Sequence, residues 1–201
     1  MRYLLFYKPF EVMSTFTDPE GRKTLGDFIE VKDVYSAGRL DYDSEGLLLL
    51  TDDGEVIHRL TDPKFDHTKT YLVQVEGVAT EEAAQRLREG VILRGERTKA
   101  AEAEIVNDPS LPPRAVRDYH PTTWMKVVLR EGKKRQLRRM TAAGGLPCLR
   151  LGRVAIGPLT LGDLQPGQWR WVTADEEMSL LKFVGLEKAA KARRTRRKID
   201  G

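Results

Sequence analysis

The segment Gly38-Arg39-Leu40-Asp41-Tyr42-Asp43-Ser44-Glu45-Gly46 is dense in carboxylates, and the apolar run Leu47-Leu48-Leu49-Leu50 follows it at once. Such a run is too short to span a membrane, so it predicts a buried β-strand. A loop anchored by a buried strand is held rigidly, which is what a reacting side chain needs. Asp41 stands near an Arg, which favours its ionised form, and near two further acids, which disfavour it. The segment therefore predicts a rigid acidic loop with Asp41 as a candidate reacting group.

An acidic loop on its own is more often a solvated turn than an active site. Two further segments favour a functional interpretation. Lys69-Thr70-Tyr71-Leu72-Val73 begins a stretch that alternates between two faces, as a half-buried strand does. Glu131-Gly132-Lys133-Lys134-Arg135-Gln136-Leu137-Arg138-Arg139-Met140 is rich in cations and predicts a helix over most of its length.

Together the three segments resemble the pseudouridine synthases, in particular the family that modifies ribosomal RNA. In that family a Gly-Arg-Leu-Asp segment carries the catalytic aspartate, which corresponds to Asp41 here. A Lys-x-Tyr segment supplies a tyrosine that packs on the target base, here Tyr71. A segment that ends in Arg-Gln-x-(Arg or Lys)-Arg-Met supplies the cation that pairs with the aspartate, here Arg138. The resemblance implies a direct contact between Asp41 and a mostly buried Arg138, with Tyr71 lining the catalytic cleft.

The resemblance extends from about Tyr3 to Val172 and includes the opening Phe6-Tyr7-Lys8-Pro9. Segments 16–25 and 121–126 are similar to the family members that act on large-subunit (23S) RNA. The resemblance implies isomerisation of a specific uridine on a flipped-out nucleotide, with ribosomal RNA, free or in a precursor particle, as the partner. Many relatives carry a separate RNA-binding module before the catalytic domain, and this chain is expected to lack one.

Length and composition bear on domain organisation. At 201 residues the chain is expected to form one catalytic domain over residues 1–186, with two lobes around one cleft, and to act as a monomer. Cys148 is the single cysteine and the three histidines are scattered, so neither an intrachain disulfide nor a metal centre is expected. No signal peptide or spanning segment is predicted, and we expect a cytoplasmic location.

Charge is distributed unevenly along the chain. The net charge is +4, but residues 188–201 alone carry +6, which leaves −2 for the rest. Residues 187–201 are expected to form a basic, disordered tail. A faintly acidic body must concentrate positive charge to bind RNA, and the run from Lys133 to Arg139, with Arg150 and Arg153, is the candidate region. The cations that we expect to contact RNA are Arg39, Lys69, Lys133, Lys134, Arg135 and Arg139.

The order of expected elements predicts an α+β fold. Strands are expected at 3–7, 47–51, 67–76, 99–106, 124–129, 148–154 and 169–172. Helices or helical turns are expected at 24–28, 55–60, 80–87 and 134–143, and from the capping box Thr173–Glu176 to about Leu186. Strands outnumber helices, and hairpin-length gaps mix with helical crossovers. This pattern argues for a mixed, mostly antiparallel sheet with flanking helices and a central catalytic cleft.

Two other classes of function remain open from the residues alone. A hydrolase acting on a glycoside or nucleoside could pair Asp41 with a second carboxylate, for which the candidates are Asp43, Asp52 and Asp53. A non-catalytic assembly factor that binds ribosomal RNA would need the basic helix and the tail but not Asp41. A synthase differs from both, because it converts uridine to pseudouridine without a change in RNA mass. That isomerisation involves no redox change and no external donor, so no cofactor is expected.

Overall fold

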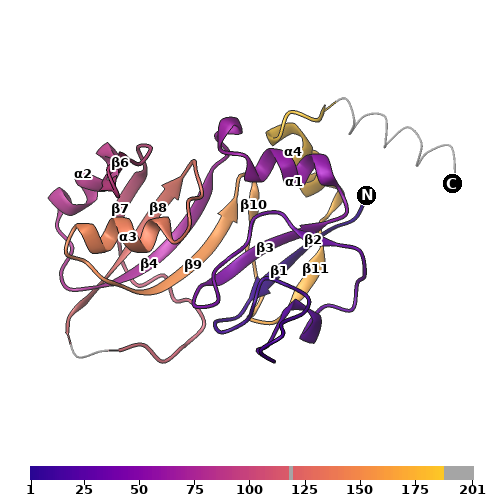
Figure 1. The fold of residues 1–201 in the computed structure, drawn as a ribbon, viewed down its shortest axis with the longest axis horizontal. Coiled ribbons are helices and arrows are strands. Elements are labelled where there is room, and N and C mark those ends of the chain that lie inside the picture. The colour runs from indigo at the N-terminus through magenta and orange to yellow at the C-terminus, as the bar shows by residue number, and fades with distance from the viewer. Residues whose placement is uncertain (118–119, 188–201) are drawn as a thin grey trace, which may run out of the picture.

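The computed structural model describes residues 1–117 and 120–187 of the chain (Figure 1). Its strands are β1 (Tyr3–Lys8), β2 (Tyr35–Ser36), β3 (Glu45–Thr51), β4 (Lys69–Glu76), β5 (Ile92–Leu93), β6 (Glu96–Arg97), β7 (Glu102–Val106), β8 (Thr122–Leu129), β9 (Cys148–Ile156), β10 (Leu159–Thr160) and β11 (Trp169–Trp171). Its helices are α1 (Gly54–Thr61), α2 (Glu81–Glu89), α3 (Gln136–Ala143) and α4 (Ala174–Phe183), with 3-10 turns at Leu25–Asp27 and Pro63–Phe65.

One mixed sheet runs through the molecule in the order β11–β1–β3–β9–β4–β8–β7 (Figure 1). Two short strands extend it, because β2 pairs with β3 and β10 pairs with β9. Neighbouring strands in this sheet are antiparallel except β3 and β9, where Glu45 lies opposite Gly152 and Gly46 opposite Arg153. The predicted α+β fold with a mixed, mostly antiparallel sheet is therefore confirmed.

The parallel junction between β3 and β9 depends on a glycine. Gly46 has a φ of +106°, and a Cβ atom at this position would lie 2.2 Å from the carbonyl oxygen of Arg153. A side chain can be accommodated neither at that φ nor at that distance. Gly46 therefore lets the end of the acidic loop lie directly against β9.

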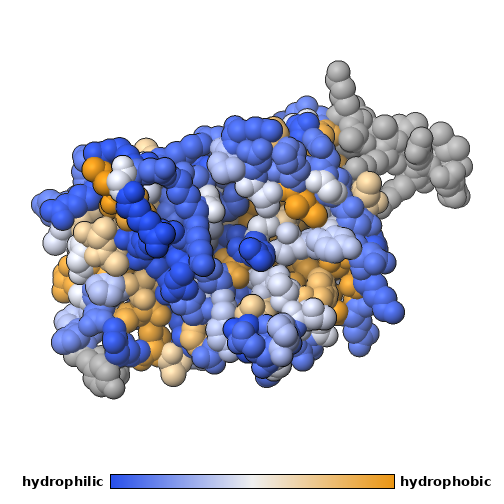
Figure 2. Space-filling model, viewed as in Figure 1, coloured by the Kyte–Doolittle hydropathy of each residue, from blue (hydrophilic) through white to orange (hydrophobic). Residues whose placement is uncertain are grey.

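The half of the sheet that contains β4 and β8 packs against α2 and α3. Val73 and Val75 of β4 share one buried cluster with Leu87 of α2 and with Leu137 and Met140 of α3. The opposite side of α3 faces solvent, and Figure 2 shows a band of hydrophilic side chains over the end of α3 nearest the middle of the molecule. The helix is thus fixed by its apolar side, and the exposed cations Lys133, Lys134 and Arg135 lie directly before it.

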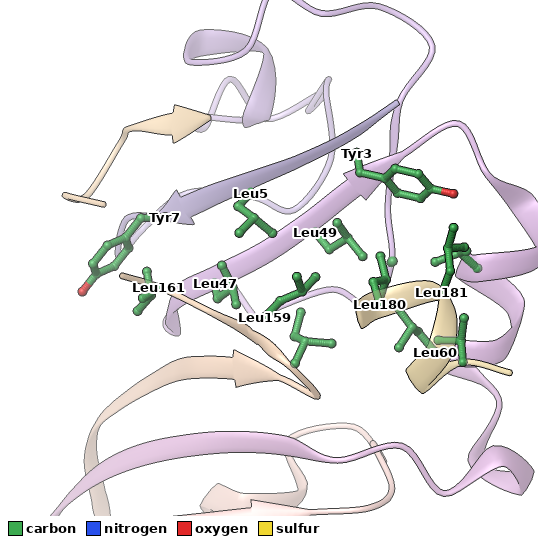
Figure 3. Close-up of a cluster of buried hydrophobic side chains, with 14 residues drawn as sticks. Tyr3, Leu5, Tyr7, Leu47, Leu49, Leu60, Leu159, Leu161, Leu180 and Leu181 are labelled. Atoms are coloured by element: carbon green, nitrogen blue, oxygen red, sulfur yellow. The ribbon is translucent and has the colours of Figure 1, made fainter. Parts of the chain in front are cut away.

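The half of the sheet formed by β1 and β3 is buried on both faces. Leu5 and Leu49 point toward Leu60 of α1 and Leu180 of α4 (Figure 3). The alternate residues of β1 and β3 pack on the other face against the segment 25–40. The run Leu47–Leu50 is completely buried, as predicted. Burial of each leucine contributes about 1.5–3 kcal/mol, so the acidic loop ends on a rigid support.

Most predicted elements are confirmed, including the capping box between Thr173 and Glu176. The last helix ends at Phe183 instead of about Leu186, because Gly185 adopts a left-handed φ of +73°. The β5–β6 hairpin was not predicted, since its strands have two residues each. Of the predicted tail 187–201, only Glu187 lies inside the described residues. Within the described ranges, no helix has the length and apolar character needed to cross a bilayer.

Candidate active site

A cleft of about 610 Å³ lies between the acidic loop and the segment that leads into α3. The segment 13–15 and the loop 38–44 form one wall, residues 129–137 form the other, and β4 and β9 contribute to the floor. Most of the predicted site residues line it: Arg39, Asp41, Lys69, Tyr71, Lys133, Lys134 and Arg135. Arg138 and Arg139 lie outside its lining.

Buried polar contacts hold the backbone of the acidic loop. The Ser14 hydroxyl donates to the Leu40 carbonyl over 2.7 Å and accepts from the Leu40 N–H over 3.1 Å. The fully buried Lys8 ammonium donates to the carbonyls of Val12 at 2.7 Å and Tyr42 at 3.5 Å. Burial lowers the pKa of Lys8 to about 7, although the carboxylates of the loop favour its charge. The backbone is therefore tethered on both sides of Asp41.

Asp41 is the carboxylate of the loop 38–44 that lines the cleft. Its carbonyl accepts from the N–H of Ser44 in a tight turn, and its side chain is 37% exposed to the cleft. The nearest cation is Arg135, whose Nη1 lies 3.9 Å from the carboxylate. Asp41 is thus weakly paired and free to meet a ligand.

The prediction that Arg138 contacts Asp41 is wrong, because Arg138 pairs with Asp43 instead. Arg138 is mostly buried, as expected, with 11% of its side chain exposed, but its ion pair is with Asp43, over 3.6 Å. Its Nη2 donates to the Asp43 carbonyl over 2.5 Å and to the Ser44 hydroxyl over 3.3 Å. Among the described ion pairs, none joins Arg138 to Asp41 within 4.0 Å. Arg138 therefore stabilises the acidic loop from outside the cleft, through Asp43 and Ser44.

Arg135 occupies the place next to Asp41 that was expected for Arg138. Its backbone adopts a left-handed conformation, with φ 52°, directly before α3. Its guanidinium donates two hydrogen bonds of 2.8 Å to the Asp43 carboxylate. Burial would raise the pKa of Asp43, but the bonds from Arg135 and the charge of Arg138 outweigh it and hold that pKa below its usual value. Asp43 therefore joins the acidic loop to the start of α3 as a carboxylate.

Two buried polar residues that the sequence did not single out support the second wall. Gln136 donates to the Glu131 carboxylate over 2.7 Å and accepts from the Lys133 N–H over 3.0 Å. Glu131 also accepts from the Lys99 N–H over 2.8 Å. These bonds hold the turn before α3, which presents Arg135. The only signal for these bonds in the sequence is the Arg135-Gln136 pair, and a single sequence does not reveal that Gln136 is buried.

Strand β4 brings two predicted residues to the floor of the cleft. Tyr71 is half-buried, lines the cleft and packs against two of the core clusters, so its predicted position is confirmed. Lys69 is 9% exposed, and burial together with the charge of Arg153 lowers its pKa to about 8. The roles proposed for both side chains stay predictions.

The cations predicted to contact RNA differ in availability. Lys133 and Lys134 are exposed at the cleft, although Lys133 bonds Glu96 over 3.0 Å. Arg150 is buried and paired with Glu45 over 2.5 Å, so the prediction that it adds to an RNA-binding surface is wrong. Arg153 is buried too, yet it lines the cleft.

The carboxylates expected for a paired-acid hydrolase are engaged elsewhere. Asp52 pairs with Arg2 over 2.9 Å, and Asp53 caps α1 and accepts from the Tyr3 hydroxyl over 2.5 Å. Asp43 is held by two arginines. No group of three His, Cys, Asp or Glu side chains suited to a metal occurs among residues 1–117 and 120–187. The cleft offers one accessible carboxylate beside an aromatic ring and several cations. That set suits attack on, or stabilisation of, a sugar carbon in a polyanion.

Comparison with known proteins gives consistent matches. The model of the family described as RNA pseudouridylate synthase matches residues 2–143. "Ribosomal large subunit pseudouridine synthase E" from Vibrio vulnificus is 52% identical over 176 residues, which are 86% of this chain and 75% of that protein. The protein of the same name from Xanthomonas campestris is 50% identical over 174 residues, which are 83% of this chain and 93% of that protein. A structure described as "Crystal structure of pseudouridylate synthase" aligns with a TM-score of 0.77 at 34% identity, covering 89% of this chain and 73% of that one.

The family match covers both walls of the cleft and the strand that carries Tyr71. The similarity to the solved structure extends it through most of the remaining chain. Sequence motif, fold and site thus agree, and the chain belongs to the RNA pseudouridylate synthase family.

Proposed function

We propose that this enzyme converts one specific uridine of large-subunit (23S) ribosomal RNA to pseudouridine, with Asp41 as the catalytic carboxylate. The observation that carries the proposal is the cleft, in which an accessible carboxylate, a half-buried tyrosine ring and several cations converge. The choice of large-subunit RNA is supported by relatives at 50–52% identity whose names specify that subunit. The enzyme acts as a monomer in the cytoplasm on free RNA or on a precursor particle.

The reaction breaks the bond from ribose C1′ to base N1, turns the base and forms a bond from C1′ to C5. C5 loses a proton and N1 gains one, so the composition of the RNA is unchanged and no cofactor is required. A carboxylate can assist by attacking the ribose or base C6, or by stabilising the cationic sugar. The target must first leave its stack, which costs a few kcal/mol. Contacts from the cleft to RNA phosphates offset part of this cost.

Around the cleft, the proposed RNA-binding surface comprises Arg39, Lys69, Lys133, Lys134, Arg135 and Arg139. The exposed members extend to the rim and act by attraction to phosphates, which weakens as the salt concentration rises. The basic segment 187–201 would add sequence-independent attraction of the same kind.

Arg138→Lys is expected to retain more activity than Arg138→Ala. Lysine keeps the positive charge beside Asp43 but lacks the planar guanidinium group that donates to both the Asp43 carbonyl and the Ser44 hydroxyl. We expect a loss of about 10-fold for Lys and about 100-fold or more for Ala, because alanine leaves buried acceptors without a donor. Single-turnover rates and thermal midpoints of both variants check this. Equal activity in both would mean that the charge of Arg138 does not matter.

Tyr71→Phe is expected to stay within about threefold of the normal rate, whereas Tyr71→Ala should lose about 10- to 100-fold. A phenylalanine ring preserves stacking on the base, which is worth about 1–3 kcal/mol per base, and alanine removes it. The measurement is the rate on one transcript at saturating RNA. A large loss in Tyr71→Phe would instead assign the hydroxyl an essential part in proton transfer.

The proposed function is tested by treating 23S and 16S transcripts with the enzyme and then with a carbodiimide, which marks pseudouridine. Primer extension should show one strong enzyme-dependent stop in the 23S transcript and none in 16S. A stop only in 16S would overturn the choice of subunit. Release of free base or sugar, or an altered RNA mass, would indicate a hydrolase, and absence of any product would leave only RNA binding.

A further inference from the structure

Two buried cations lie together at the floor of the cleft. Lys69 comes from β4 and is 9% exposed, and Arg153 comes from the neighbouring strand β9 and is 1% exposed. Both line the cavity that also contains Asp41 and Tyr71. They are close enough for the charge of Arg153 to disfavour the charge of Lys69.

Neither cation has a counter-charge in the described parts of the chain. The Nε and Nη2 atoms of Arg153 donate to the neutral carbonyls of Leu47 and Gly38, each over 2.8 Å. Within residues 1–117 and 120–187, no carboxylate lies within 4.0 Å of either cation, and no hydrogen-bond acceptor is found for the Lys69 ammonium. A buried charge without a partner is costly and is seldom retained without a purpose.

Other buried cations near the cleft lie beside carboxylates. Arg150 pairs with Glu45 and Arg138 with Asp43. The Lys8 ammonium donates to three backbone carbonyls, and the nearby carboxylates of Glu45, Asp43 and Asp41 favour its charge. Lys69 and Arg153 differ from them, because Arg153 donates only to neutral carbonyls and the one charge acting on Lys69 is that of Arg153.

We propose that Lys69 and Arg153 form an internal anion site that takes one backbone phosphodiester next to the flipped-out uridine. This inference rests on the proposed function, because the substrate there is RNA. A nucleotide that places its ribose beside Asp41 brings its own two phosphates with it, and a phosphodiester carries the single negative charge that the floor lacks. Arginine and lysine are the usual phosphate-binding side chains.

A phosphate held here acts differently from one held at the rim. Both side chains are largely buried, so the attraction is stronger and less screened by salt than a contact with an exposed lysine. Burial and the charge of Arg153 hold the pKa of Lys69 at about 8. A bound phosphate would favour the charged ammonium and raise this pKa. The site can thus contribute to extrusion of the target by binding a phosphate only when the nucleotide is inside the cleft.

A double-mutant cycle between protein and RNA tests the site. The RNA is a short stem-loop around the uridine that carbodiimide mapping identifies, with one neutral methylphosphonate placed in turn at each linkage beside it. We expect one linkage to weaken binding by about 10- to 100-fold in the unchanged protein and by less than about threefold in Lys69→Met. Lys126→Met is the matched control, since Lys126 is exposed on β8 and pairs with Glu104. Its response should equal that of the unchanged protein.

Two further measurements separate this site from a structural role and from failure of the proposed function. Lys69→Met should raise the thermal midpoint, because it removes an unpaired buried charge. A lowered midpoint would show that Lys69 stabilises the fold and would overturn the site.

Inorganic phosphate, titrated against chloride at equal ionic strength, should bind saturably to the unchanged protein and not to Lys69→Met. If the unmodified stem-loop gave no product, the proposed function would fail, and this titration would still decide the anion site. Additivity at every linkage, or equal phosphate binding in both proteins, would overturn it.

Discussion

Asp41→Asn is expected to abolish pseudouridine formation, lowering the single-turnover rate by on the order of 10⁴-fold, while RNA binding stays nearly unchanged. The substitution keeps the shape of the side chain and removes its charge. Asp41 is 37% exposed and its nearest cation lies 3.9 Å away, so the loop loses little support and the thermal midpoint should hardly move. The measurements are product formation by carbodiimide mapping, RNA affinity by filter binding, and thermal unfolding.

Asp43→Asn is the matched control, because it makes the same chemical change two residues away. Asp43 accepts two hydrogen bonds from Arg135 and pairs with Arg138, so this variant should loosen the contact between the acidic loop and α3. We expect the rate to fall by about 10-fold and the free energy of unfolding by about 1 kcal/mol, with measurable product remaining. Near-normal turnover in Asp41→Asn, with none in Asp43→Asn, would exchange the roles of the two carboxylates.

Features that depend on residues close together in sequence could be predicted. Asp41 lies in the short loop that leads into β3, and Tyr71 lies within β4, so each belongs to a short motif beside or inside a predicted strand. The capping box of Thr173 and Glu176 is also local, since its two residues are three apart and bond each other's backbone. The α+β class follows in the same way from the order and spacing of such elements.

Contacts that cross the cleft could not be predicted from spacing. Arg138 reaches Asp43 instead of Asp41 because both carboxylates belong to one turn, and the helix position decides between them. Arg135 turns toward the loop only because its backbone adopts a left-handed conformation before α3. Arg150 and Arg153 are three apart on β9, yet one pairs with a buried glutamate and the other lines the cleft. These outcomes depend on the β3–β9 pairing, which joins segments far apart in sequence.

Glu45→Met is expected to cause the greatest loss of stability among the substitutions considered, about 3–5 kcal/mol in the free energy of unfolding. The side chains of Glu45 and Arg150 are 5% and 6% exposed, and their charged atoms lie 2.5 Å apart. Arg114 approaches the same carboxylate at 3.4 Å. Arg150 also donates to the Pro112 carbonyl over 2.8 Å, so the pair joins β3, β9 and the segment around residue 112. Methionine would leave the buried arginine without its counter-charge, directly behind the acidic loop.

Chemical denaturation of single and double variants measures this contribution. Glu45→Met/Arg150→Met should recover most of the lost stability, because replacing both members of a buried pair by apolar side chains of similar size is often nearly neutral. Glu55→Met serves as the control for losing a glutamate, since Glu55 is 52% exposed and pairs with Arg59 on the surface of α1. That control should change the free energy of unfolding by no more than about 0.5 kcal/mol. A loss in Glu45→Met as small as in Glu55→Met would contradict the buried pair. A double variant less stable than Glu45→Met would show instead that Arg150 stabilises the fold through the Pro112 carbonyl.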